Sequence, residues 1–326
     1  MRYLLTLLNV ILAAILLYIL IYPKIQAGKV IEAKIIYEED ISALPLYVAK
    51  EKGFFDSLKI SVTMEETPKR GEEFDEIIKS TAHMGSGIPW TTLLFKSAAR
   101  PEAVRLILSV ESTISEPHDA IFVKKERIRR KRIKKYKDFE GRRVGFPRGS
   151  MYDLLLKYFL KGENVNIDKI VFIPVSYSEM DSAIQNNLVD VLLCVEPARS
   201  VLKNDKSVVL FEDAFLEKHL ITPFPVGAHF TSLANINLNR REVKRIVSAL
   251  NMAVDLIRTN PEEALNIARK YLKFTEDIEI SVFSFKKYDE IDETNLGRFA
   301  KLLYEAGVVL FEIPVSEMLL KPEEAR

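Results

Sequence analysis

The sequence lacks the residues from which disulfide frameworks and thiolate metal sites are built. Its 326 residues include one cysteine, Cys194. A single cysteine excludes an intramolecular disulfide and a zinc site made of several cysteines. Cys194 also lies in an apolar segment, which is typical of a packing residue rather than of a nucleophile. We predict no metal, no cofactor and no catalytic residue, and we expect that the protein is not an enzyme.

An excess of charge of one sign is also lacking, because 47 Lys and Arg residues stand against 46 Asp and Glu residues, for a net charge of +1. A chain with this balance is not drawn to nucleic acid as a whole, so no nucleic-acid partner is predicted. Glutamine is scarce, with only Gln26 and Gln185. This composition is expected of a heat-adapted organism. The chain is long enough, and at 48% hydrophobic residues apolar enough, for two lobes with their own cores.

Residues 3–22 lack charge altogether, and Thr6 and Asn9 are the polar breaks in this apolar run. A helix of that length spans roughly 30 Å, the thickness of the hydrocarbon core of a bilayer. We therefore predict a transmembrane signal anchor at 1–23 and a linker at 24–32. The membrane is then a partner through residues 3–22, and the globular part is expected to be extracytoplasmic, at the cell surface or in the periplasm. Cleavage after Ala27 is the alternative, although the residues before it make a poor cleavage site.

Strands and helices alternate along the rest of the chain. The predicted strands are 33–37, 60–64, 82–89 with its turn, 104–110, 120–124, 143–146, 169–174 and 189–195, and 224–237 is read as extended. The predicted helices are 45–52, 72–80, 90–98, 151–161 and 180–186, another that opens at 196–197, and a helical remainder at 240–306. This alternation indicates βαβ units and mostly parallel sheets. The predicted lobes are 33–118 with 226–326, and 119–225.

The stretch 143–156 reads as a buried strand, a turn with glycine and proline, and the start of a helix. Gly149 lets the backbone turn sharply, and Ser150 is the predicted N-cap. A strand that leads directly into a helix presents free N–H groups at the positive end of the helix dipole. With Arg148 beside it, this end is suited to an anion or a polar ligand. An ordinary βα turn has the same pattern, so other loops must support the prediction.

Four segments resemble, in order, the nitrate, sulfonate, taurine and thiamine-pyrimidine-precursor group of periplasmic binding proteins. These segments are 43–55, 137–150, 189–197 and 299–308. The resemblance implies an α/β, two-lobed type II periplasmic-binding-protein fold, here with an N-terminal membrane-anchor helix. It also implies a small-molecule ligand in the cleft between the lobes. The implied partners are the permease and ATPase subunits of an ABC importer.

Ligands of open α/β sheets bind beyond the carboxyl ends of the strands, and four loops of this chain qualify. The predicted ligand-binding residues are Ser42, Pro45, Ser86, Gly87, Trp90, Arg148, Gly149, Ser150, Met151 and Glu196. Tyr152, Tyr177 and Phe230 are further aromatic candidates for stacking on a flat ligand. Arg148 and the helix N-termini favour an anion such as a sulfonate. The aromatic residues and Glu196 favour a heteroaromatic amine or a pyrimidine, so the ligand class stays open.

Two other functions share the implied fold. One is an enzyme, such as a menaquinone-pathway-like lyase or a pyrimidine-precursor synthase, and the other is a ligand-sensing domain. The synthase depends on a cysteine cluster that one cysteine cannot supply.

Two departures from the family also stand out. His83 occupies a position where the family usually has aspartate, and is expected to be structural. The basic run 124–137 is long for a connection, and is either a solvated segment or a contact with the membrane surface or the permease.

Overall fold

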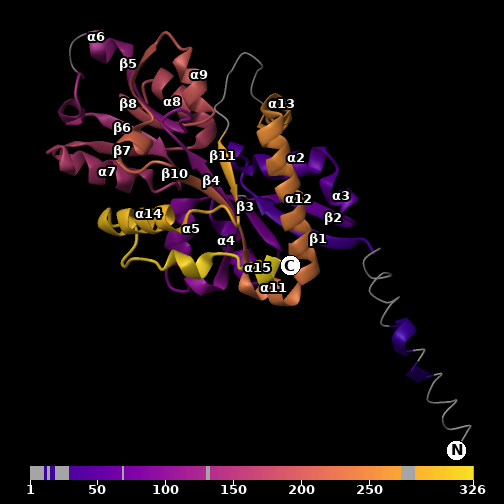
Figure 1. The fold of residues 1–326 in the computed structure, drawn as a ribbon. Helices are drawn as coiled ribbons and strands as arrows, with labels where there is room; N and C mark the ends of the chain where they lie inside the picture. The colour runs from indigo at the N-terminus through magenta and orange to yellow at the C-terminus, as the bar shows by residue number, and fades with distance from the viewer. Residues whose placement is uncertain are drawn as a thin grey trace, which may run out of the picture.

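The computed structural model describes residues 11–12, 15–18, 29–67, 70–129, 133–272 and 283–325 (Figure 1). Most of the predicted anchor at 1–23, and most of the linker at 24–32, lie outside these residues. Among the residues that the structure describes, none belongs to a helix that is long and apolar enough to cross a membrane. The predicted basic run also lies partly outside them, at 130–132.

The first sheet has six strands in the order β11-β4-β10-β3-β1-β2. Their bounds are β1 (Ile31–Tyr37), β2 (Ile60–Glu66), β3 (Met84–Pro89), β4 (Val104–Ser112), β10 (Phe224–Ser232) and β11 (Ser284–Lys287). Strand β1 pairs in parallel with β2 and β3. Strand β10 runs antiparallel to both β3 and β4, and β11 runs antiparallel to β4.

The second sheet has five strands in the order β7-β6-β8-β5-β9. Their bounds are β5 (Asp119–Lys124), β6 (Arg143–Pro147), β7 (Val171–Val175), β8 (Val191–Val195) and β9 (Val208–Asp213). Strand β6 pairs in parallel with β7 and β8, whereas β5 runs antiparallel to β8 and β9. The chain passes between the sheets twice, after β4 and before β10. The division into two lobes at 118/119 and 225/226 stays a prediction.

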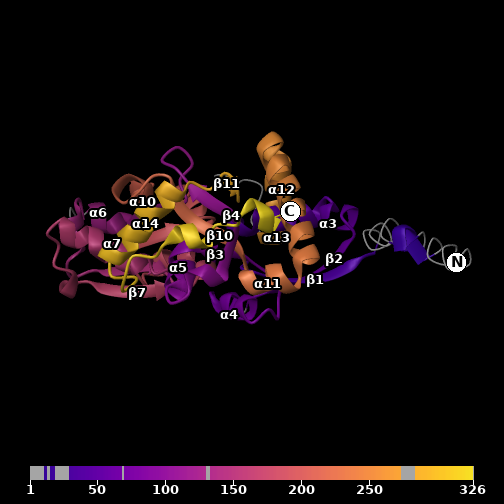
Figure 2. The same ribbon diagram turned by 60° about the horizontal axis from the view of Figure 1, so that its bottom comes forward.

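Helices cover both sheets, and Figure 2 shows the long helix α12 (Arg240–Thr259) against the first of them. The other helices are α2 (Leu44–Glu51), α3 (Phe54–Ser57), α4 (Glu72–Ile78), α5 (Trp90–Ser97), α6 (Lys125–Arg129), α7 (Tyr152–Gly162), α8 (Met180–Gln185), α9 (Ala198–Lys203), α10 (Phe215–His219), α11 (Leu233–Leu238), α13 (Pro261–Leu272), α14 (Glu293–Glu305) and α15 (Pro322–Ala325). A short 3-10 helix, η1 (Ile41–Ala43), precedes α2.

Three predictions about secondary structure are wrong. The sheets are mixed rather than mostly parallel, because each includes strands that pair antiparallel with their neighbours. Residues 233–237, predicted to be extended, form most of α11, since Ser232 accepts the Asn235 N–H and starts a helix there. The helical remainder at 240–306 is interrupted by β11, and β9 is a strand that the pattern did not indicate.

The central strands of the first sheet are buried on both faces, as the all-buried pattern of β3, β4 and β10 shows. Their close packing requires glycine at one position. A Cβ atom at Gly85 would lie 2.3 Å from the Phe230 ring of the neighbouring strand. We expect Gly85→Ala to lower the free energy of unfolding by about 2 kcal/mol, because the fully buried Phe230 ring must shift within a close-packed core. Chemical denaturation measures this, and an unchanged midpoint would contradict the packing.

Candidate functional site

A cavity between the two sheets is the first part of the candidate site. It is lined by Asp40, Ile41, Ser42, Arg70, Gly87, Pro89, His118, Tyr152, Tyr177, Glu196 and Val226. Most of these residues follow the carboxyl ends of β1, β2, β6, β7 and β8. Gly87 and Pro89 belong to the last residues of β3, and His118 and Val226 lie at the two crossovers. We call it the inner cavity. Its volume is about 10 Å³, which is room for one water molecule.

A wider groove adjoins the inner cavity, and we call it the outer groove. Its volume is about 550 Å³, and its lining residues are Glu38, Glu39, Glu66, Thr67, Arg70, Arg148, Gly149, Ser176, Tyr177 and Ser178. Both spaces share Arg70, from the first lobe, and Tyr177, from the second. The guanidinium carbon of Arg70 lies 3.6 Å from the centre of the Tyr177 ring. This stacked pair therefore separates the inner cavity from the outer groove.

Arg70 is held in place by carboxylates of its own lobe. Its Nη1 forms an ion pair with Glu38 and lies 2.8 Å from Asp40 Oδ2. Burial raises the pKa of Glu38 well above its ordinary value, against the lowering effect of Arg70. Burial also raises the pKa of Glu73, a buried carboxyl that interacts with Glu38 and Arg70. This part of the cleft wall thus combines the Arg70 guanidinium with carboxyl groups whose burial favours their protonated form.

His118 lies in the first crossover and lines the inner cavity. It is 6% exposed, and its Nδ1 has no hydrogen-bond partner within the described part of the chain. Burial lowers its pKa to about 3, so the ring is neutral at physiological pH. A buried polar atom without a partner is costly, and such atoms are rare in folded proteins. His118 is therefore suited to exchange a hydrogen bond with a bound solute.

Two tyrosines from the second lobe complete the wall of the inner cavity. Tyr152 begins α7 and is 2% exposed, and Tyr177 follows β7. The Tyr152 ring packs edge-on against the His118 ring, with 6.5 Å between the centres. Burial raises the pKa of both phenols, so both remain protonated hydrogen-bond donors. Together these rings offer flat apolar surface and polar edges to a ligand.

Glu196, at the end of β8, has its charge matched within its own lobe. Its Oε1 accepts hydrogen bonds from Arg199 Nη1 at 2.8 Å and from Ser200 Oγ at 3.0 Å. Its Oε2 accepts the Ser200 backbone N–H at 3.2 Å. Burial raises its pKa and Arg199 opposes the shift. Glu196 thus holds the first turn of α9 in place through hydrogen bonds. It also lines the inner cavity.

The structure brings five of the predicted ligand-binding residues to the cleft. Ser42, Gly87 and Glu196 line the inner cavity, and Arg148 and Gly149 line the outer groove. Arg148 is therefore separated from the inner cavity by the Arg70 and Tyr177 pair.

The other five lie outside both linings. Pro45 is buried in the first turn of α2. Ser86 shares a hydrogen bond of 2.9 Å with His229 Nδ1, and Trp90 Nε1 donates to Ser109 Oγ at 3.1 Å. Ser150 is fully buried, and Met151 is partly buried with a left-handed φ of 59°.

The predicted helix cap at Ser150 is wrong, and a capping residue that was not predicted is present at Asp40. The Asp40 carboxylate caps η1, because it accepts the Ser42 N–H at 2.7 Å. Met151, rather than Ser150, is the N-cap of α7, and its side chain accepts no capping hydrogen bond. Ser150 Oγ still accepts the Tyr152 N–H at 3.2 Å. The turn reaches its helix one residue later than the sequence pattern indicates, because Met151 takes the left-handed conformation.

The turn at Gly149 and Ser150 joins the two lobes through its carbonyl groups. Thr92 Oγ1 donates to the Gly149 carbonyl at 3.0 Å, and Thr91 Oγ1 donates to the Ser150 carbonyl at 2.5 Å. Both threonines lie in the first turn of α5 in the other lobe. The sequence predicted that this turn donates N–H groups to a ligand, whereas its carbonyls accept hydrogen bonds across the cleft.

Sequence reasoning did not find Arg70 and His118. Each lies in an irregular segment, and neither belongs to a motif with a fixed spacing. His83, by contrast, lies outside both linings. Its Nδ1 accepts the Lys34 N–H at 3.0 Å and its carbonyl accepts the Thr231 hydroxyl at 2.7 Å, which are structural contacts.

Sequence comparison gives one family and several partial relatives. A profile of the family described as NMT1/THI5 like matches residues 40–264. A predicted binding protein of Brucella abortus (strain 2308) is 26% identical over 145 residues. The match includes 43% of this chain and 44% of that relative. The chain therefore spans less than half the length of the curated relatives that it matches.

Solved structures resemble the whole described fold. The periplasmic aliphatic sulphonate binding protein SsuA from Escherichia coli has a TM-score of 0.68 and 15% identity, over 89% of this chain and 92% of that one. The desulfurization enzyme DSZB has a TM-score of 0.67 and 14% identity, over 90% of this chain and 97% of that one. At these identities the likeness concerns the fold alone. It confirms the predicted α/β fold of periplasmic binding proteins.

Proposed function

Because this chain belongs to the NMT1/THI5-like family, we propose that it is the substrate-binding component of an ABC importer. The observation that carries this proposal is the inner cavity, whose wall combines residues of both lobes with a buried, unpartnered His118 nitrogen. A solute held there contacts both lobes at once, which couples binding to closure. SsuA of Escherichia coli, which has this fold, is named as a periplasmic binding protein.

The lining favours a small heteroaromatic solute in the inner cavity. Asp40 and Glu196 border it, and the neighbouring Arg70 and Arg199 are already paired with carboxylates. A strong anion would therefore meet no unpaired cation there, whereas a planar ring can lie against Tyr152 and exchange hydrogen bonds with His118. An anionic solute, the alternative, would instead place its charge in the outer groove near Arg148.

Loading the inner cavity requires the lobes to separate, because about 10 Å³ cannot hold a ring. The contacts that must part are the stacking of Arg70 on Tyr177 and the two threonine hydrogen bonds to the Gly149 and Ser150 carbonyls. The two crossovers are the segments about which the lobes turn. This makes the described conformation the closed one.

The importer role implies permease and ATPase subunits as partners. We place the globular part outside the cytoplasm, held to the membrane through residues 3–22. A ligand-sensing protein would have the same cleft without these transport partners. Uptake of the bound solute by cells separates the two roles, because a sensor binds the solute and leaves its uptake unchanged.

An enzyme is the second alternative, since DSZB shares the fold. Cys194 does not support it, because burial raises the pKa of its thiol well above the ordinary value and keeps it protonated. We expect Cys194→Ala to leave solute affinity within about twofold and to cost about 1 kcal/mol of stability. Calorimetric titration and thermal unfolding measure the two effects. Loss of turnover of any substrate in this variant would favour the enzyme instead.

Native mass spectrometry of the full chain tests the proposal. We expect a co-purified small molecule, and we expect His118→Ala to weaken its binding by about tenfold, because one buried hydrogen bond is lost. Arg148→Ala is the matched comparison, since it lies only on the outer groove. A heteroaromatic solute should bind this variant unchanged, whereas an anion should bind it about tenfold more weakly. A His118→Ala variant that retains full affinity for its solute would remove the inner cavity from the site.

A further inference from the structure

A second pocket lies on the first lobe, far from the cleft. It is formed where β10 ends and β4 begins, whereas the inner cavity lies near the start of β10 and the end of β3. Its walls come from α4, α5, α11 and the segment between α5 and β4. Its volume is about 470 Å³, within the usual range of small-molecule sites.

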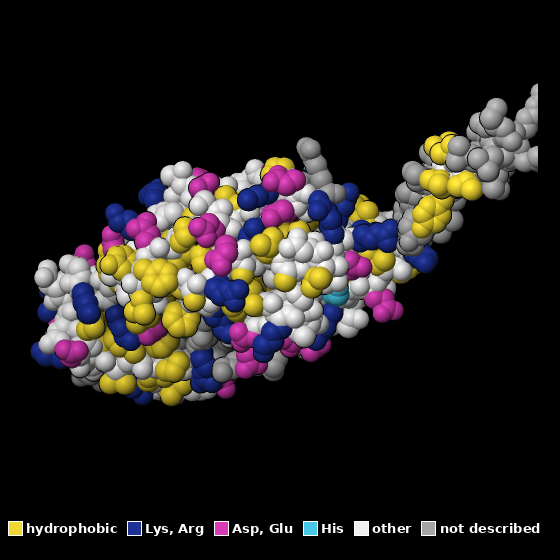
Figure 3. Space-filling view, turned by 90° about the horizontal axis from the view of Figure 1, so that it is seen from below, with side chains coloured by type: hydrophobic (Ala, Val, Ile, Leu, Met, Phe, Trp, Pro, Cys, Tyr) yellow, Lys and Arg dark blue, Asp and Glu magenta, His cyan; other side chains and the backbone are white. Residues whose placement is uncertain are grey.

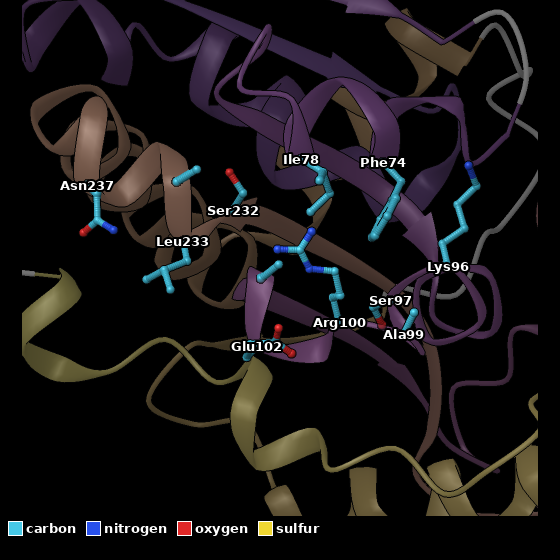
Figure 4. Close-up of a pocket in the computed structure, with 12 residues that line it drawn as sticks. Phe74, Ile78, Lys96, Ser97, Ala99, Arg100, Glu102, Ser232, Leu233 and Asn237 are labelled. Carbon is cyan, nitrogen blue, oxygen red and sulfur yellow. The ribbon is translucent and has the colours of Figure 1, made fainter.

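Most of the wall is apolar, and one cation projects into it. Phe74, Ile78, Leu233 and several alanines form the apolar surface. Figure 4 shows the Arg100 guanidinium in the middle of the pocket, with Ile78 and Phe74 on one side and Ser232 and Leu233 on the other. Within the described part of the chain, no ion pair or hydrogen bond of the Arg100 side chain is present.

The other charged groups of the pocket restrict the ligand to one negative charge. Lys96 is already paired with Asp75, with 3.0 Å between Nζ and Oδ2. Glu102 adds a carboxylate to the lining, and Figure 4 shows it on the far side of Arg100 from Ile78. A dianion would therefore have one charge without a partner. The wider face seen in Figure 3 carries acidic and basic side chains interspersed, so its field favours neither sign.

We propose that this pocket binds a small amphipathic carboxylate, whose carboxylate pairs with Arg100 and whose apolar body lies against Phe74, Ile78 and Leu233. The planar guanidinium matches a carboxylate with two parallel hydrogen bonds. The apolar walls remove an alkyl chain or a ring from water. The site is independent of the solute in the cleft, because the two share no lining residue.

The test uses octanoate as the probe, with octylammonium and 1-octanol as matched molecules that lack the negative charge. The full chain carries ¹⁵N-labelled arginine, and the Arg100 Nε–H signal is assigned by its loss in Arg100→Ala. We expect octanoate to shift this signal with a dissociation constant of about 1 mM, as suits a ligand of about ten heavy atoms. Neither octylammonium nor 1-octanol should bind as tightly.

Variants decide whether the pocket is responsible. We expect Arg100→Ala to weaken octanoate binding, measured by titration calorimetry, by at least fivefold, and Leu233→Ala by about threefold. Arg298→Ala is the matched control, because Arg298 is an exposed arginine of α14 that lines a different pocket. It should leave binding unchanged. Equal binding of the three probes, or an Arg100→Ala variant with unaltered affinity, would overturn the proposal whatever the cleft is found to bind.

Discussion

Arg70→Ala will lower the free energy of unfolding by about 3 to 5 kcal/mol at pH 8, the typical cost of removing one partner from a buried ion pair. The change leaves Glu38 and Asp40 without their cation. It also removes the stacking on Tyr177 that closes the inner cavity. Thermal and urea unfolding measure the loss of stability.

The same variant should be less damaged at pH 5 than at pH 8. Arg70 lowers the pKa of Glu38, which burial raises, so without the guanidinium this carboxyl takes up its proton more readily. A protonated Glu38 carries no charge that needs a partner, and more of it is present at the lower pH. An Arg70→Ala variant that is equally destabilised at both pH values would show that the ion pairs do not carry the effect.

Two further variants separate the ion pairs from the stacking. Arg70→Lys keeps the positive charge but has no planar group to lie on the Tyr177 ring. Tyr177→Leu keeps the ion pairs and removes the ring. We expect both to lose less stability than Arg70→Ala, and both to ease the separation of the lobes that a ring needs to enter the inner cavity.

The fold could be predicted from the sequence because its signals are local. The ends of β3 and β8 could be predicted because glycine or proline marks the passage from a buried strand to a helix there. Gly87, within β3, and Glu196, directly after β8, line the inner cavity. Strand β11 was missed because four residues are too few to show a period between two helical segments.

The rest of the site depends on contacts between segments far apart in the sequence. Arg70 becomes part of the cleft only because Tyr177, more than 100 positions away, lies beneath its guanidinium. Arg148 was favoured for its charge beside a turn, but no local pattern indicates which of two adjoining spaces the side chain reaches. His118 lies in a crossover, where neither helical nor strand periodicity marks a side chain as buried.

A buried pair of carboxyl groups lies where the chain passes between the lobes. Asp119 begins β5 just after the first crossover, and Glu217 lies in α10 just before the second. Glu217 Oε1 accepts hydrogen bonds from the Ser112 hydroxyl and from the His118 backbone N–H. Asp119 Oδ1 accepts the Leu216 N–H at 3.1 Å. The second oxygen of each carboxyl is buried and has no other partner among the described residues.

When the pair of carboxyl groups holds one proton, these two remaining oxygens form a hydrogen bond with each other. Burial raises the pKa of Asp119 well above its ordinary value, and the charge of Glu217 raises it further. The unfolded chain releases this proton near pH 4, the ordinary range of aspartate, whereas the folded chain retains it. Above that pH the unfolded state binds fewer protons than the folded state. Stability due to this pair therefore falls as the pH rises from about 4 towards the raised pKa of the folded protein.

Asp119→Asn will stabilise the protein at pH 8 by about 1 to 3 kcal/mol and will flatten this part of its pH dependence. The amide supplies permanently the hydrogen that the pair otherwise takes from a proton, and it keeps an oxygen for the Leu216 N–H. At pH 4 the two proteins should be nearly equal, because the folded wild type holds the shared proton and the unfolded wild type has only begun to release it. Urea unfolding at pH 4, 6 and 8 gives the comparison.

Asp168→Asn is the matched control, since Asp168 is exposed. It should leave the pH profile unchanged. The double variant with Asp119→Asn and Glu217→Gln adds a stricter test. It places two amide groups face to face. One of them must then either leave its own nitrogen or oxygen without a hydrogen bond, or lose the hydrogen bond that it accepts from a backbone N–H. We expect it to be less stable at pH 8 than Asp119→Asn alone by about 1 to 3 kcal/mol. Parallel pH profiles for the wild type and Asp119→Asn would mean that the two carboxyls do not share a proton across the crossovers.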